Sequence, residues 1–204
     1  MDSHVDGIIN PELFAKEEIK ILFIGKEPNK SNHNVAEGEI VSFIDEWNNG
    51  KPNYKFAHRI AELAYGIFTN FREHDEISGE EKIEKKEKRL KVLKRIAFLN
   101  IKKEAGKDTI SDKELSTAVT KNKPEIDEQI KIIKPNVIII FVSNKKIVEQ
   151  LFNKIEFKPS GFGCLYGEKG DFRILQMYHP SVRIGSAALY SLLKVNFEKL
   201  GWVS

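Results

Sequence analysis

Cysteine is nearly absent from this sequence of 204 residues, and Cys164 is the only one. A single thiol excludes a disulfide framework, a four-thiolate zinc site and a cysteine-ligated iron–sulfur cluster. Long apolar runs are missing as well, because none approaches the roughly 20 residues that a membrane-spanning helix needs. The first residues, Met1 to His4, lack the basic and apolar segments of a signal peptide. We therefore expect a cytoplasmic protein that does not bind membranes.

The sequence also lacks an excess of charge of one sign. Its 33 basic and 30 acidic side chains give a formal net charge of +3, which excludes a strongly cationic surface. If the protein binds nucleic acid, it must do so through a local patch. Apolar residues make up 41% of the chain and aromatic residues 10%, which is enough for one core and too much for a disordered chain. The length predicts a single domain over residues 1–204.

Four short apolar runs predict β-strands, and each ends at a turn-forming or polar residue. The runs are residues 19–24, 95–99, 137–142 and 173–178. They are rich in β-branched residues and too short for buried helices. Apolar character on both faces is typical of strands in a parallel sheet that is covered on each side.

The segments between these runs predict helices. Apolar residues recur at helical spacing near residues 43–47 and within 56–67, 80–95, 124–133 and 187–200, with Pro124 suited to a helix start. Residues 162–178 contain glycines that predict a hairpin leading into the last strand. Strands that alternate with helices favour an α/β fold, a three-layer α/β/α sandwich.

Polar residues follow three of the predicted strands at the point where each ends. Glu27 follows the first strand, Asn100 the second and His179 the fourth. Because the carboxyl ends of parallel strands share one edge of the sheet, we expect these side chains to meet there. A carboxylate, an amide and an imidazole on three loops form a plausible catalytic set.

Each of these residues also has a purely structural interpretation. Glu27 can be a solvated loop residue, and Asn100 can cap the element that follows it. His179 can be a hydrogen-bonded structural histidine, and Pro28 and Pro180 can simply end strands.

Three motifs in chain order resemble those of the uracil-DNA glycosylase superfamily. They are Gly25-Lys26-Glu27-Pro28, Leu99-Asn100 and His179-Pro180-Ser181. The segment from Phe98 to Gly106 is also similar to the central motif of that family. The resemblance spans about residues 19–200 and implies a four-stranded parallel sheet between helices. It further implies excision of uracil or another deaminated base from DNA, with DNA containing a damaged base as the partner. We expect no metal and no cofactor, and a monomer.

The resemblance assigns roles to individual residues. Glu27 takes the position that activates water and faces the developing sugar cation, Asn100 the position that reads the base, and His179 the position that donates a hydrogen bond to the departing base. Gly25, Lys26, Pro28 and Ser181 complete the substrate-binding loops. Tyr54 and Phe56 are candidates for stacking on the base, with core packing as the alternative for Phe56. A positive sugar and a negative base in the transition state require a carboxylate and a donor at the broken bond.

Three departures from the family pattern indicate an outlying branch. The acidic residue is Glu27 where the best-known uracil enzymes have aspartate, Asn29 stands where they have an aromatic residue, and Val182 replaces a common proline. The lone Cys164 excludes the branches that carry an iron–sulfur cluster.

Basic residues near the expected edge are candidates for contacts with DNA phosphates. They are Lys102 and Lys103 after the second strand, Lys145 after the third and Arg183 after the His-Pro-Ser motif. In the resembled family the loop after that motif enters the duplex. Here Val182 and Ile184 offer an apolar wedge, or alternatively pack beneath the final helix.

Two other functions remain open at this point. One is a non-catalytic module on the same fold that binds nucleic acid or nucleotides. The other is an unrelated small-ligand enzyme that binds phosphate with residues 25–29 at a helix N-terminus. The second is disfavoured, because the segment contains neither Gly-x-Gly-x-x-Gly nor Gly-Lys-Ser/Thr.

Overall fold

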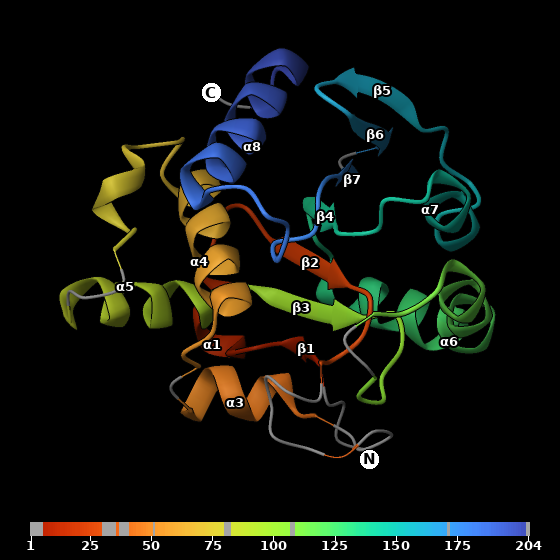
Figure 1. The fold of residues 1–204 in the computed structure, drawn as a ribbon, viewed down its shortest axis with the longest axis horizontal. Helices are drawn as coiled ribbons and strands as arrows, with labels where there is room; N and C mark the ends of the chain where they lie inside the picture. Colours follow the sequence, from red (N-terminus) through yellow and green to blue (C-terminus); the bar gives the residue numbers. More distant parts are fainter. Residues whose placement is uncertain are drawn as a thin grey trace.

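The computed structural model describes residues 6–29, 36, 41–50, 52–79, 83–106, 109–170 and 172–202. Within these residues one sheet contains seven strands in the order β1-β3-β2-β4-β7-β6-β5 (Figure 1). Four neighbouring strands at its centre run parallel to one another. They are β3 (Ala97–Asn100), β2 (Ile21–Gly25), β4 (Val137–Ile140) and β7 (Phe172–Gln176).

The α/β class is confirmed, but the expected four-stranded parallel sheet is wrong, because the sheet is larger and mixed. β1 (Gly7–Ile8) pairs antiparallel with β3 at one side. At the other side β6 (Cys164–Lys169) pairs antiparallel with β7, and β5 (Lys158–Gly161) with β6. These three strands are short or carry exposed residues, so none of them forms the continuous apolar run that marks the central strands. The hairpin expected within residues 162–178 is present as β6 and β7.

Helices cover both faces of the sheet (Figure 1). On one face lie α3 (Phe43–Asn49), α4 (Lys55–Phe68), α5 (Ile83–Leu93) and α8 (Ser186–Leu200). On the other lie α1 (Pro11–Ala15), α6 (Asp112–Ile133) and α7 (Lys145–Leu151). A short 3-10 helix, His74–Glu76, precedes α5.

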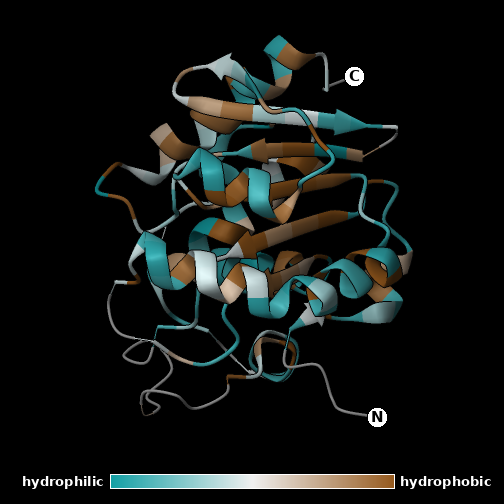
Figure 2. Cartoon of the chain, turned by 90° about the vertical axis from the view of Figure 1, so that its right-hand side faces the viewer, coloured by the Kyte–Doolittle hydropathy of each residue, from teal (hydrophilic) through white to brown (hydrophobic). Residues whose placement is uncertain are grey.

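Alternation along β2 explains the two cores. Ile21 and Phe23 point to the α4 and α8 face, whereas Leu22 and Ile24 point to the α6 face, and all four are fully buried. Figure 2 shows the strands as a largely hydrophobic stack, with polar residues on the surrounding helices.

The helix predicted to start at Pro124 starts at Asp112 instead, and Pro124 lies inside it. A capping box sets the true start: the Ser111 hydroxyl accepts from the Glu114 N–H, and the Glu114 carboxylate accepts from the Ser111 N–H. The buried residues in the first half of α6 lie at helical spacing, but only Leu115 and Val119 among them are large apolar residues, so the apolar pattern there is weak. α6 has 22 residues, but neither it nor any other helix in the described part of the chain is apolar enough to cross a membrane.

Candidate active site

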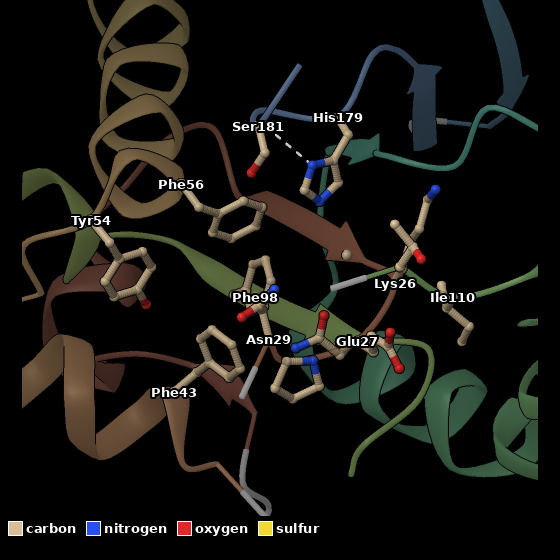
Figure 3. Close-up of a pocket in the computed structure, with 14 residues that line it drawn as sticks. Lys26, Glu27, Asn29, Phe43, Tyr54, Phe56, Phe98, Ile110, His179 and Ser181 are labelled. Carbon is tan, nitrogen blue, oxygen red and sulfur yellow. Dashed lines mark hydrogen bonds between the residues drawn. The ribbon is translucent and has the colours of Figure 1, made fainter. Parts of the chain in front are cut away.

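A cavity of about 320 Å³ opens at the edge where β2, β3 and β7 end (Figure 3). It is lined by the candidate catalytic residues together with aromatic and loop residues. The lining residues are Gly25, Lys26, Glu27, Pro28, Asn29, Phe43, Tyr54, Phe56, Phe98, Asn100, Thr109, Ile110, His179 and Ser181. The structure thus brings Glu27, Asn100 and His179 together, as expected from the shared edge, and Tyr54 lines the same cavity.

The loops after β2 and β3 are joined by backbone hydrogen bonds beyond the end of the sheet. The N–H of Lys102 donates to the carbonyl of Lys26 over 2.8 Å, and that of Gly106 to the carbonyl of Pro28 over 2.9 Å. Asn29 and Gly106 form an isolated parallel bridge. The two strands therefore continue into a common rim around the cavity.

The Glu27 carboxylate lies against this rim and is 7% exposed. Its Oε2 atom accepts a hydrogen bond of 2.8 Å from the Lys102 ammonium group. A Cβ atom at position 106 would lie 1.9 Å from the same oxygen, so Gly106 leaves the space that the carboxylate fills. Lys102, expected to contact DNA, is placed by the structure on Glu27.

Asn100 ends β3 and is 2% exposed. Its backbone N–H donates to the Asp6 carboxylate over 2.7 Å. Its side-chain Nδ2 atom is buried and has no hydrogen-bond partner among the described residues. A Cβ atom at position 25 would lie 2.5 Å from Asn100 Oδ1, so Gly25 gives the amide its room. The cavity therefore has one buried amide donor available to a ligand.

His179 presents a second donor. Its Nδ1 atom accepts a 3.2 Å hydrogen bond from the backbone N–H of Ser181, from which we infer that the proton of the neutral ring sits on Nε2. Nε2 makes no hydrogen bond within the described part of the chain, and Figure 3 shows it directed into the cavity. Burial, followed by the charge of Lys26, lowers the pKa of His179 from 6.5 to about 4. The ring is therefore a neutral donor at pH 7.

Aromatic side chains form one wall of the cavity. Phe56 stacks on the His179 ring, with centroids 5.3 Å apart and planes at 28°, so it supports the imidazole. The Tyr54 hydroxyl accepts from Trp47 Nε1 over 2.8 Å, and burial raises its pKa. Phe43 and Phe98 pack together with centroids 4.7 Å apart.

Sequence reasoning missed Phe43, Phe98 and Gly106. Phe98 had a usable signal, because residues two apart in a strand share a face and Asn100 is two residues further on. Phe43 had none, since it lies on α3 and not at the end of any of the predicted strands.

The remaining predicted DNA contacts lie outside the cavity lining. Lys145 is the first residue of α7 and pairs with Glu149 over 3.4 Å. Lys103 turns inward to Asp6, 2.8 Å away. Arg183 is exposed and makes no ion pair within the described residues.

The loop that carries Arg183 is held from behind by Arg59 on α4. The buried Arg59 guanidinium donates to the carbonyls of Pro180, Val182 and Ile184, the second over 3.0 Å. Ile184 remains 37% exposed. The backbone of this loop is therefore fixed, while an apolar side chain and a cation face outward.

The cavity combines a carboxylate, a neutral imidazole donor and an amide donor. In the described residues, His, Cys, Asp and Glu side chains form no group of three or more that could hold a metal ion. Comparison with protein-family models and with curated protein sequences finds no match for this chain. The arrangement itself therefore carries the functional argument.

Proposed function

We propose that this protein is a DNA glycosylase that hydrolyses the N-glycosidic bond of uracil or another deaminated base. The observation that carries the proposal is the pair of unpartnered donors, Asn100 Nδ2 and His179 Nε2–H, in one cavity with the Glu27 carboxylate. The mixed α/β fold, with helices on both faces of the sheet, supports the same proposal, in which the chain would be an outlying member of the uracil-DNA glycosylase superfamily.

The chemistry follows from charge. As the bond between sugar and base breaks, the sugar becomes positive and the base negative. Glu27 faces the sugar and positions the attacking water, while His179 donates to a carbonyl oxygen of the departing base. Water supplies hydroxide to the sugar carbon and a proton to the base nitrogen. Lys102 keeps the carboxylate in place through their 2.8 Å contact.

Two donors in the cavity favour a deaminated base. Deamination replaces an exocyclic amine, which donates, by a carbonyl, which accepts. A carbonyl oxygen can accept a hydrogen bond from Asn100 Nδ2. The amine of cytosine or adenine cannot, so two buried donors would face each other without an acceptor. The base has to leave the stack to enter the cavity, and a mispaired base leaves most easily.

A strand-cleavage assay tests the proposal. Single- and double-stranded oligonucleotides carrying uracil, hypoxanthine or xanthine are incubated with the protein and treated with alkali to cleave abasic sites. We expect cleavage of at least one deaminated substrate and of none of the matched cytosine, adenine and guanine controls. Cleavage of none of the substrates would overturn the proposal.

One observation favours a second candidate, a non-catalytic module that binds nucleic acid or nucleotides. Glu27 is buried and already paired with Lys102, so its carboxylate is engaged before any substrate arrives. Such a module would bind the same oligonucleotides without releasing a base, and Glu27→Gln would leave its affinity unchanged.

A further inference from the structure

A buried charged cluster lies directly behind Asn100. It consists of Asp6, Lys103 and Gln129, which are 2%, 8% and 4% exposed. Asp6 precedes β1, Lys103 lies on the loop after β3, and Gln129 belongs to α6. Three distant segments of the chain thus meet at the back of the cavity.

Every group in the cluster has a partner. The Asp6 carboxylate accepts from the Asn100 N–H over 2.7 Å and from Lys103 Nζ over 2.8 and 3.0 Å. Gln129 Nε2 donates to the Asp6 carboxylate and to its backbone carbonyl, each over 3.1 Å, and Gln129 Oε1 accepts from Lys103 over 3.0 Å. A fully satisfied buried network favours one arrangement of its members.

The Asp6 carboxylate accepts the hydrogen bond that a backbone carbonyl of a neighbouring strand would otherwise accept from the Asn100 N–H. The pairing of β1 with β3 ends at Gly7 and Phe98, so the Asn100 N–H lies beyond the last strand pair on that side. The Asp6 side chain fills this role. A buried ion pair is an expensive way to add stability, because apolar residues of similar volume often do as well. The location of this ion pair behind Asn100 therefore indicates that it fixes the position of Asn100.

We propose that Asp6 is a positioning residue that fixes Asn100 for reading the base, with Lys103 and Gln129 holding the Asp6 carboxylate. This inference rests on the proposed function. Asp6 is not among the residues that line the cavity and acts only through Asn100, which does line it. A displacement of about 1 Å in such a group can cost on the order of 100-fold in rate.

A double-mutant cycle tests whether Asp6 acts through Asn100. We expect Asp6→Ala to slow single-turnover excision by roughly 10- to 100-fold. In the Asn100→Ala background the same change should add almost nothing, because coupled residues are not additive. Affinity for an oligonucleotide with an abasic site should stay at the wild-type level, since that ligand has no base for Asn100 to contact. Asp6→Asn keeps an oxygen acceptor for the Asn100 N–H and should restore part of the rate.

Glu17→Gln is the matched control, because it removes the charge from a partly buried pair with Arg95 that precedes β3 at its other end. It should leave excision unchanged. Additive effects of Asp6→Ala and Asn100→Ala, or an equal loss of abasic-site affinity, would overturn the positioning role.

A readout without catalysis separates this inference from the proposed function. Absence of excision by the wild-type protein would refute the glycosylase proposal alone. The rate of hydrogen exchange at the backbone N–H of Asn100 then tests the positioning role. Protection should fall in Asp6→Ala, fall less in Asp6→Asn, which keeps an oxygen acceptor, and persist in Glu17→Gln. Unchanged protection in Asp6→Ala would overturn the positioning role.

Discussion

The imidazole of His179 shows how two local contacts set the chemistry of one residue. The Ser181 N–H occupies Nδ1, and burial together with Lys26 lowers the pKa to about 4. A proton on Nδ1 would have to displace that hydrogen bond. The unfolded chain takes up the proton near pH 6.5, so the folded state loses stability as pH falls from about 6.5 to 4.

Activity should follow the same titration. We expect the excision rate of the wild-type protein not to rise between pH 7 and 5, and to fall as pH approaches about 4, where His179 becomes charged. Lys26→Met removes the second cause of the lowered pKa, so the acid fall should begin at a higher pH. Single-turnover rates at a series of pH values measure both effects. A steep rise in rate from pH 7 to 5 would mean that the imidazolium acts.

Removing the charge of Glu27 tests the other half of the mechanism. Glu27→Gln keeps the size of the side chain and should lower the excision rate by roughly 10²- to 10⁴-fold, the usual range for a positioned acid or base. Glu104→Gln is the control, because Glu104 lies on the neighbouring loop and pairs with the exposed Lys121. Equal single-turnover rates for wild type and Glu27→Gln would refute the water-positioning role.

At the scale of elements, the loop after the His-Pro-Ser motif has its backbone fixed by Arg59 and its Arg183 side chain exposed. If it enters the duplex, Arg183→Ala should weaken duplex binding and reduce the salt slope of binding by about one unit. Excision from single strands should suffer less, because no stack has to be opened.

Lys145→Ala provides the matched control for that loop, since Lys145 pairs with Glu149 on α7. It should leave the slope and the ratio of the two rates unchanged. Wild-type salt dependence in Arg183→Ala, with equal rates on both substrates, would show that the loop does not engage DNA.

The strands that could be predicted from the sequence are those in which most residues are buried. β2, β3, β4 and β7 are covered on both faces, so each reads as an apolar run, and the polar residues at their ends fall on one edge. β1 was missed because it has only two residues, and β5 because two of its four residues are exposed and only Ser160 is buried. The start of α6 required recognising the Ser111 capping box rather than Pro124.

The partner that a lysine side chain contacts was harder to predict than the position of a strand. Lys103 is buried because its partner, Asp6, lies 97 residues earlier in the chain. Lys102 points to Glu27 for a similar reason, across 75 residues. No local pattern separates these lysines from solvated ones, since the deciding carboxylate arrives only with the tertiary fold.

For the whole molecule, the near balance of charge limits how salt affects DNA binding. The net charge is only +3, and of the four basic residues expected to contact DNA, Lys102, Lys103 and Lys145 lie in ion pairs, which leaves Arg183 for phosphates. We expect log K to fall with log salt at a slope of magnitude about 1–3, at roughly 0.9 per phosphate contact. Fluorescence anisotropy across a salt series measures it. A slope of about 6 or more would require phosphate contacts from basic residues other than these four.

The strand order also affects how fast the protein folds and regains activity. Glu27, Asn100 and His179 lie at the carboxyl ends of β2, β3 and β7, which become neighbours only through long crossovers of the chain. Such non-local pairing is slow compared with helix formation. A chain diluted from denaturant should therefore regain its helical signal first and remain inactive, and excision should return only when the last central strand has joined the sheet.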